Sequence, residues 1–303
     1  MHKIALFLAT EKGCTCLKRL VSGGRASNIG CVVSFNEVNV AHDWRNDIET
    51  LCRAEGIRFF VWRDIRGKLS EIFSENEITS AAAVSWRYLL PLEINNCLKI
   101  PLIVFHDSLL PKYRGFAPTP TAIINGENIL GITALFAADE ADNGDIILQR
   151  KMYVPDDMYM PEIVSEQAEI YADMLMDLLD MIETGSIRPE KQDESQATYS
   201  IWRNYDDCRI NWHKSSEYIY NFVRALGRPY LGAYCCYDNA KIIIDRSEVI
   251  NDKYFEIRDA GKIWSIRDNM PEVVCGSGML RIIAAHSENG ERVFFRKLRV
   301  RLE

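Results

Sequence analysis

The sequence predicts an α/β protein in which a mainly parallel sheet, covered by helices on both faces, is followed by a small β-barrel domain. Short apolar or β-branched runs alternate with helical patterns through the first 185 residues, and short strand-like runs separated by turns occupy the chain from residue 241 onward. A polar segment at residues 186–198 separates the two patterns. These observations predict two domains of different architecture.

The first part of the chain alternates strongly. Strands are expected at residues 3–9, 28–35, 58–61 and 78–84. A turn at residues 10–13 is expected to lead into a helix through Leu17 and Leu20, and further helices are expected at residues 42–55 and 65–73. Such alternation is typical of parallel strands joined by crossover helices. The first turn contains Gly13 but no GxGxxG or GxxxxGK[ST] string, so phosphate binding by either of those motifs is not predicted.

The central stretch adds further strands at residues 101–105, 131–136 and 146–148, with a helix between them at residues 119–125. A long helix is expected at residues 156–182, because apolar residues recur every three to four positions until Gly185. The polar segment that follows is interpreted as a linker. We therefore expect a catalytic domain at residues 1–196 and a second domain at residues 197–303.

The second domain begins with a helical pattern at residues 215–225. Six short strand-like runs follow, at residues 241–244, 254–257, 261–266, 272–274, 279–284 and 293–300. This spacing is typical of a small barrel, a fold that often binds nucleic acid. Residues 201–303 carry 17 Lys and Arg against 14 Asp and Glu, so strong electrostatic binding of nucleic acid is not expected.

The composition is that of an ordinary globular chain, with 48% hydrophobic and 26% charged residues among 303. The net charge of −7 weighs against a nucleic-acid partner, including a tRNA substrate. Nine scattered cysteines without a CxxC pair or metal-ligand spacing predict reduced thiols, no metal site and a cytoplasmic protein. No apolar run approaches membrane-spanning length, so no membrane association is expected.

A histidine, His106, stands where the run at residues 101–105 ends, and Asp142 follows the run at residues 131–136. Ligands of open α/β sheets bind at the carboxyl ends of the strands, and we expect the acidic turn to face the same edge. An imidazole can move protons near neutral pH, and a carboxylate can orient it and stabilise its charged form. For this pair alone, a capping histidine and a solvated acidic turn would be the better explanation.

The residues around the pair form a specific string. His106 is followed by Ser108-Leu109-Leu110-Pro111 and then Arg114-Gly115, and Asp142 belongs to an Asp-x-Gly. This string resembles the signature of the formyltransferases that use 10-formyltetrahydrofolate, which is Asn-x-His-x-Ser-Leu-Leu-Pro, then Arg-Gly and Asp-x-Gly. The resemblance covers nearly the whole chain. It implies a Rossmann-like catalytic domain, a C-terminal OB-like barrel, 10-formyltetrahydrofolate as formyl donor and a homodimer.

The resemblance also implies roles for individual residues. His106 and Asp142 are expected to be catalytic, and Ser108, Leu109 and Lys112 to bind the substrate. The loop after the fourth strand, the central strand and the acidic turn are expected to hold the cofactor through Trp86, Arg87, Tyr88, Leu89, Val104, Asp139, Glu140 and Ala141. A flat heteroaromatic ring needs apolar walls and a few backbone donors and acceptors, as such loops provide. The alternative is that Trp86 and Tyr88 only pack the loop onto the sheet.

Arg114 also has two interpretations. It could bind a phosphate or carboxylate of the substrate, or it could hold its own loop in place by hydrogen bonds. We favour the second, because Arg-Gly pairs in tight loops often serve geometry.

Val104 departs from the resembled signature, because it stands where the family has its asparagine. Loss of one oxyanion donor typically costs about 100- to 1,000-fold in rate, and Ser108, a backbone N–H or a water could replace it. Three functions therefore stay open. The first is an N-formyltransferase for a small primary amine, with a nucleotide-linked amino sugar as the favoured acceptor. The second is a 10-formyltetrahydrofolate hydrolase, a group that resembles this chain in having an aliphatic residue here. The third is a catalytically inactive folate-binding protein.

Overall fold

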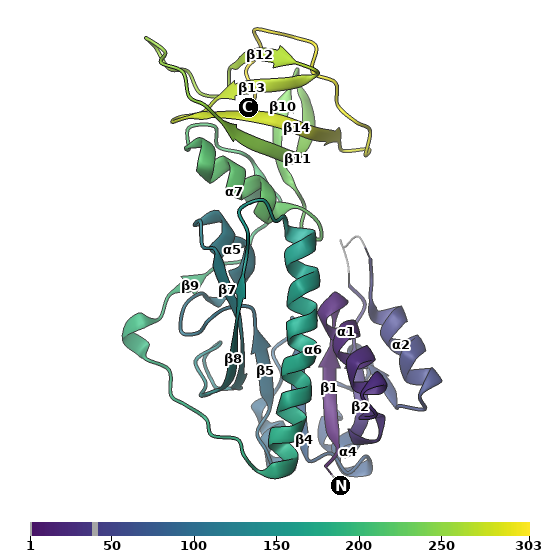
Figure 1. The fold of residues 1–303 in the computed structure, drawn as a ribbon. Coiled ribbons are helices and arrows are strands. Elements are labelled where there is room, and N and C mark those ends of the chain that lie inside the picture. Colours follow the sequence, from purple (N-terminus) through teal and green to yellow (C-terminus); the bar gives the residue numbers. More distant parts are fainter. Residues whose placement is uncertain (1, 38–41) are drawn as a thin grey trace. The chain divides into compact units, whose positions relative to one another are not determined.

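The computed structural model describes residues 2–37 and 42–303, which form two compact units (Figure 1). The first unit consists of Met1–Pro118, Ile129–Val154 and Glu162–Ser200. The second consists of Thr119–Asn128, Pro155–Pro161 and Ile201–Glu303. Two short segments of the predicted catalytic domain, 119–128 and 155–161, therefore cluster with the second unit, because the chain leaves the first unit twice before residue 200.

The first unit is built on a seven-stranded sheet with the order β3-β2-β1-β4-β5-β7-β8. The five strands from β3 to β5 run parallel, whereas β7 is antiparallel to both of its neighbours. The predicted mainly parallel sheet is thus confirmed. Its strands are β1 (Ile4–Leu8), β2 (Ile29–Ser34), β3 (Phe59–Val61), β4 (Ser80–Val84), β5 (Ile103–His106), β7 (Ile129–Phe136) and β8 (Ile146–Tyr153).

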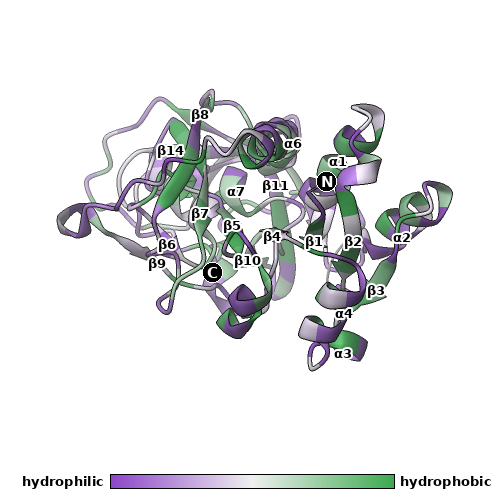
Figure 2. Cartoon of the chain, turned by 90° about the horizontal axis from the view of Figure 1, so that it is seen from below, coloured by the Kyte–Doolittle hydropathy of each residue, from purple (hydrophilic) through white to green (hydrophobic). Residues whose placement is uncertain are grey.

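Helices cover both faces of this sheet, and β1 shows why. All five of its residues are buried, and successive side chains enter opposite core clusters, with Leu6 in one and Phe7 in the other. The Leu6 cluster includes α1 (Thr10–Ser22) and α6 (Met160–Thr184), and the Phe7 cluster includes α3 (Trp62–Ile65) and α4 (Leu69–Glu75). Helices α1 and α2 (Arg45–Ala54) carry both hydrophobic and hydrophilic residues in Figure 2, as amphipathic covering helices do.

One helix prediction in this unit was wrong. A single helix was expected at residues 65–73, but α3 ends at Ile65 and α4 begins at Leu69. Gly67 lies between them, and glycine disfavours a continuous helix by about 1 kcal/mol relative to alanine.

The second unit is a five-stranded antiparallel sheet with the order β10-β11-β14-β13-β12. Helix α7 (Ser216–Leu226) packs against β11, and the Ser215 hydroxyl accepts a hydrogen bond from the backbone N–H of Tyr218 at the start of this helix. The strands are β10 (Ala233–Tyr237), β11 (Ala240–Ile250), β12 (Ile263–Arg267), β13 (Met270–Val274) and β14 (Met279–Ser287).

The last residues join the two edges of this sheet. Glu303 and Cys236 of edge strand β10 exchange backbone hydrogen bonds, while Leu302 bonds to Gly261 and Val300 accepts from Ile263 of edge strand β12. Leu302 is only 2% exposed. Pairing both edges with one segment produces the predicted barrel-like domain and leaves neither edge strand wholly unpaired.

Two strand predictions in the second unit were wrong, and one strand was missed. Residues 254–257 and 293–300 form no strand, and Tyr254 and Ile257 are more than 80% exposed. The first run is exposed, and the second makes single backbone hydrogen bonds at its two ends, from Val293 to Ala285 and from Ile263 to Val300, so alternation alone was not sufficient. Strand β10 was missed because its Ala-Tyr-Cys-Cys-Tyr sequence does not alternate in polarity.

The remaining elements are short. They are helix α5 (Pro118–Ile124), strands β6 (Arg114–Gly115) and β9 (Tyr199–Ser200), and the 3₁₀ helices η1 (Ala26–Asn28), η2 (Leu92–Cys97), η3 (Glu194–Gln196) and η4 (Asp206–Cys208). Within residues 2–37 and 42–303, none of the helices combines the length and the apolar character needed to cross a bilayer.

Candidate active site

His106 is the last residue of β5, and its side chain is almost completely buried at 7% exposure. Its Nε2 lies 2.8 Å from the backbone carbonyl oxygen of Tyr113. A carbonyl can only accept a hydrogen bond, so Nε2 carries a proton and donates it. The neutral ring then has its lone pair on Nδ1, which is therefore the nitrogen that can accept a proton.

Asp142 lies next to that nitrogen. One of its carboxylate oxygens, Oδ1, is 3.5 Å from His106 Nδ1, and the other accepts a hydrogen bond of 2.8 Å from the backbone N–H of Gly115. A protonated His106 would face an acceptor at each ring nitrogen, the Tyr113 carbonyl and the Asp142 carboxylate. The two residues singled out by their sequence context are thus brought together in an arrangement that suits proton transfer.

The path that brings Asp142 to His106 differs from the prediction. The acidic turn was expected at the same edge of the sheet because it follows a strand. However, β7 is antiparallel to β5, and its last residue, Phe136, pairs with Ile103 at the opposite end of β5 from His106. The turn must fold back along the sheet to reach His106, and Asp142 adopts a left-handed backbone conformation with φ of 59°.

The loop after His106 uses its own polar groups internally. The Ser108 hydroxyl donates a hydrogen bond of 2.6 Å to the carbonyl of Lys112, and the Ser108 carbonyl accepts one from the Thr133 hydroxyl. Because a serine hydroxyl has one hydrogen, Ser108 has none left to donate to an oxyanion in this arrangement. Leu109 packs over Gly131, and the Lys112 side chain is exposed. Substrate binding by these three residues stays a prediction.

Arg114 holds its own loop in place. Its side chain is 1% exposed and donates two hydrogen bonds to the Gln192 side-chain oxygen, of 3.1 and 2.8 Å, and two to the Glu194 carboxylate, of 2.8 and 2.7 Å. These bonds engage all three of its guanidinium nitrogens. The arrangement agrees with the structural interpretation that the sequence favoured.

The expected cofactor wall is partly apolar. Trp86 makes edge-on contacts with Phe7, Phe35 and Trp62, at ring-centroid distances of 5.0 to 5.6 Å. Val104 and Trp86 pack against the same core cluster. Because strand side chains alternate, Val104 also points to the same face of the sheet as His106. A flat ring placed beside His106 on this face would meet an apolar wall.

The other expected cofactor residues lie on the surface. Leu89 is 92% exposed and Tyr88 is 48% exposed, and Arg87 pairs with Glu37 across 3.0 Å. Burial raises the pKa of Glu37, although the Arg87 charge opposes this shift. Residues 139–141 are all exposed in the acidic turn, and the Glu140 carboxylate accepts a hydrogen bond of 3.1 Å from the Asn143 side chain. Cofactor binding by Arg87, Tyr88, Leu89, Asp139, Glu140 and Ala141 stays a prediction.

A buried ion pair beside His106 was missed. Lys12 on the first turn of α1 lies 2.7 Å from both carboxylate oxygens of Asp107, which also accepts a hydrogen bond from the Tyr171 hydroxyl on α6. Burial opposes ionisation of Asp107, but the Lys12 charge and these hydrogen bonds outweigh it and keep the pKa of Asp107 below its ordinary value. Burial and the Asp107 charge raise the pKa of Tyr171 well above its ordinary value.

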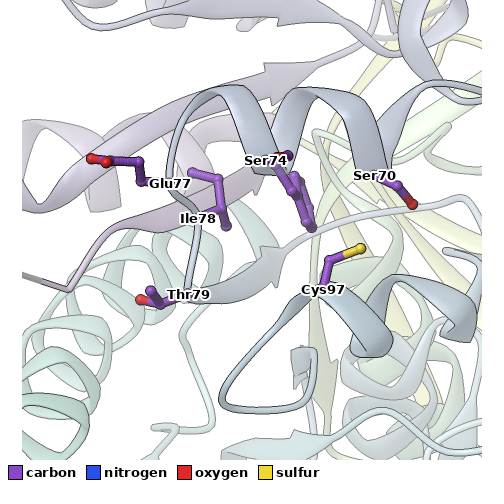
Figure 3. A pocket seen from close by; sticks show the side chains of 7 residues that line it. Ser70, Ser74, Glu77, Ile78, Thr79 and Cys97 are labelled. Carbon is purple, nitrogen blue, oxygen red and sulfur yellow. The ribbon is translucent and has the colours of Figure 1, made fainter.

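The hollow shown in Figure 3 is remote from this site. It has a volume of about 380 Å³ and is lined by residues such as Phe73, Thr79 and Cys97. Thr79 directly precedes β4, so the hollow lies at the amino ends of the parallel strands, whereas His106 lies at a carboxyl end. Among the described residues no group of His, Cys, Asp and Glu is arranged to hold a metal ion.

Comparisons with known proteins agree with this geometry. A formyl transferase family model matches residues 64–173, and a model of the formyl transferase C-terminal domain matches residues 204–298. The methionyl-tRNA formyltransferase of Fusobacterium nucleatum is 32% identical over 211 residues, which are 69% of this chain and 67% of that protein. That of Clostridium acetobutylicum is 32% identical over 219 residues, with coverages of 72% and 68%.

Two solved structures have the same fold over nearly their whole length. WlaRD, a sugar 3N-formyl transferase determined with dTDP and 5-N-formyl-THF, has a TM-score of 0.70 at 19% identity, with 95% of this chain and 98% of that chain covered. The N-formyltransferase of Helicobacter canadensis, in complex with folinic acid and dTDP-3-aminofucose, has a TM-score of 0.70 at 16% identity, with coverages of 93% and 99%.

Proposed function

This chain belongs to the formyl transferase family and is a formyl-transferring enzyme with 10-formyltetrahydrofolate as donor, and we propose that it formylates the primary amine of a nucleotide-linked amino sugar. The observation that carries the proposed chemistry is the pairing of His106, at a buried strand end, with Asp142. The methionyl-tRNA formyltransferases that this chain matches are covered over about two thirds of their length.

In the proposed reaction the acceptor nitrogen bonds to the formyl carbon, and the bond from that carbon to the folate nitrogen breaks. The amine loses one proton, and the folate nitrogen gains one. His106 Nδ1 is placed to take the proton from the amine, because Nε2 already donates to Tyr113. Asp142 then stabilises the imidazolium across 3.5 Å, and Gly115 keeps the carboxylate in place.

The tetrahedral intermediate needs a donor for its oxyanion. Val104 has none, and the Ser108 hydroxyl hydrogen is directed to the Lys112 carbonyl. A backbone N–H is therefore the proposed donor, and protonated His106 contributes its charge only, because both of its ring nitrogens already face acceptors. The apolar wall formed by Val104 and Trp86 supports the placement of the flat pterin ring on this face of the sheet.

A sugar amine is proposed as the acceptor for two reasons. WlaRD and the Helicobacter canadensis enzyme, whose structures were determined with dTDP or a dTDP-linked amino sugar, match 93 to 95% of this chain at TM-scores of 0.70. The net charge of −7 is also unfavourable for a polyanionic acceptor. Methionyl-tRNA is the second candidate acceptor, because the 32% identical relatives carry that name.

The test is consumption of 10-formyltetrahydrofolate by the purified protein. It is measured without acceptor, with a dTDP-linked 3-amino sugar, and with methionyl-tRNA. Consumption that requires the amino sugar supports the proposal. Consumption that requires methionyl-tRNA would make methionyl-tRNA the acceptor in place of the amino sugar. Consumption without any amine would identify a hydrolase, the alternative that Val104 favours. Folate binding with no consumption would identify an inactive binding protein.

A further inference from the structure

We propose that Gln192 is a positioning residue for the His106–Asp142 pair, and that the polar segment at residues 190–200 is a strap over the active site instead of a free linker. The proposal rests on the proposed catalytic role of Asp142. The strap is hydrogen-bonded along its length, beginning with an antiparallel bridge between Glu190 and Ile146 of β8. Its middle and end contact the two loops that carry the site.

Gln192 fixes the turn that carries Asp142. Its side-chain Nε2 donates a hydrogen bond of 2.7 Å to the backbone carbonyl of Asp142 and one of 2.8 Å to that of Gly144. The turn needs such restraint, because a non-glycine residue with φ of 59° costs on the order of 1 kcal/mol or more. A Cβ on Gly144 would meet the Phe136 carbonyl oxygen at 1.9 Å, so this turn is tightly packed against its own strand.

The same side chain fixes the second loop. Gln192 Oε1 accepts two hydrogen bonds from Arg114, of 3.1 and 2.8 Å. The next residue, Gly115, donates its N–H to the Asp142 carboxylate, and the preceding residue, Tyr113, accepts the bond from His106. One amide therefore links the backbone that bears Asp142 to the backbone that contacts both catalytic side chains.

The end of the strap adds contacts to this backbone. The Thr198 hydroxyl accepts a hydrogen bond of 2.9 Å from the Tyr113 N–H, and the Thr198 carbonyl accepts one from the Arg114 N–H. Strands β6 and β9 pair here, with Arg114 opposite Tyr199 and Gly115 opposite Ser200. Residues 113–115 are thus held from one side by the strap and contact His106 and Asp142 from the other.

Only an amide can make both sets of contacts. A glutamate at position 192 would keep the acceptor for Arg114 but lose the two N–H donors to the Asp142 turn, and a methionine would lose both. Because a displacement of about 1 Å in a catalytic group can cost roughly 100-fold in rate, the effect of either change should appear in kcat. The described hydrogen bonds of the Gln192 side chain go to Arg114, Asp142 and Gly144, none of which belongs to the apolar wall that is expected to hold the folate.

The test compares Gln192→Met and Gln192→Glu with a matched control, Gln196→Met. Gln196 lies on the same strap, is exposed and donates only to Asp193. Steady-state kcat, the KM for 10-formyltetrahydrofolate and the thermal midpoint are measured for each variant, with the acceptor that supports consumption of 10-formyltetrahydrofolate in the assay described above. We expect both Gln192 variants to lose about 10- to 100-fold in kcat with KM changed less than about threefold, and Gln196→Met to behave as the wild type.

A kcat within about twofold of the wild type for folded Gln192→Met or Gln192→Glu would overturn the proposal, as would an equal loss in Gln196→Met. Should Gln192→Met not fold, Gln192→Glu decides the question, because it keeps the bond to Arg114. Asp142→Asn in the same assay separates the two proposals. If Asp142→Asn is inactive while the Gln192 variants are fully active, only the positioning role fails, and if Asp142→Asn is active, the proposed catalytic pair fails as well.

Discussion

At the scale of single residues, the structure allows the chemistry of His106 to be separated from its packing. His106 is 7% exposed, so a truncation would leave a cavity, whereas glutamine fills a similar volume and still offers an N–H to the Tyr113 carbonyl. We expect His106→Gln to lower turnover by about 100- to 10,000-fold, since a general base is lost. Asp142→Asn keeps an acceptor for Gly115 but removes the charge, and should also be strongly impaired.

Both of these variants should melt within a few degrees of the wild type in thermal denaturation, because each replacement keeps the main hydrogen bond of the residue. A large fall in the melting temperature of both, with activity lost in proportion to unfolding, would assign the pair a structural role. This outcome would favour the capping histidine and solvated acidic turn that were considered first.

Val104 offers a prediction about the missing oxyanion donor. It points to the same face of the sheet as His106 and is only partly buried, so an asparagine can be accommodated there. We expect Val104→Asn to raise kcat for formyl transfer by about tenfold or more, because one such donor is typically worth about 100- to 1,000-fold. The measurement is kcat with and without the amine acceptor, and Val104→Leu serves as the control for packing. A fall in kcat for Val104→Asn would show that the site depends on an apolar residue at this position.

At the scale of elements, a buried ion pair joins α1 and α6 to Asp107, the residue that directly follows β5. Lys12 has a side-chain exposure of 7% and Asp107 of 24%, and Tyr171 is almost fully buried. Removing one partner leaves the other charge with too little compensation. We expect Lys12→Met to lower the free energy of unfolding at pH 7 by roughly 2 to 4 kcal/mol, somewhat less than for a fully buried pair.

Arg19→Met is the matched control for this change. Arg19 also lies on α1 and pairs with Glu169 and Asp173 of α6, but all three side chains are more than a third exposed. Its loss should cost about 0 to 1 kcal/mol, and both variants are compared by urea denaturation. Equal losses of unfolding free energy in the two variants would contradict the expectation that the buried Lys12 pair stabilises the fold more than the exposed Arg19 pairs.

The same ion pair predicts a dependence on pH. The pKa of Asp107 is lowered in the folded protein, so its contribution to stability is present above the unfolded value of about 4 and is lost as the pH falls through the folded value. In Lys12→Met the burial effect on the pKa of Asp107 is no longer outweighed by the lysine charge. The stability deficit of this variant should therefore be largest near pH 7 to 8 and shrink at pH 5, which urea midpoints at these pH values would measure. A stability deficit of Lys12→Met that does not change with pH would show that the charge of Asp107 is not its cause.

At the scale of the whole molecule, local patterns predicted most of the fold and part of the site. The alternation of Leu6 and Phe7 between two cores, and the position of His106 at a strand end, follow from residues adjacent in sequence. The contact of Lys12 with Asp107 joins residues 95 positions apart, and that of Gln192 with Asp142 joins residues 50 apart. Such pairs depend on how elements pack, and nothing in their local sequence distinguishes them from solvated surface residues.

The same limit explains why the polar strap was interpreted as a linker. Its composition matches that of a solvated connection, and only its backbone pairing with residues 111–116 and with Ile146 reveals its place in the first unit. Conversely, the run at residues 293–300 has the composition of a strand but bonds to neighbouring strands only at its two ends, through Val293 and Val300, and forms no strand. Polarity alone therefore misassigned both segments, in opposite directions.

The charge of the whole molecule leads to a prediction that discriminates between the two acceptors. The chain carries a net charge of −7, and its last 103 residues have an excess of only three Lys and Arg over Asp and Glu. A protein that neutralises 6 to 10 phosphates loses about 10³- to 10⁵-fold in affinity between 50 and 200 mM salt, whereas a ligand with two phosphates responds far less. We expect kcat/KM for a dTDP-linked 3-amino sugar to change by less than about tenfold over this range. Methionyl-tRNA that is formylated efficiently at 50 mM salt, with a loss of 10³-fold or more at 200 mM, would instead identify an extended basic surface and make tRNA the acceptor.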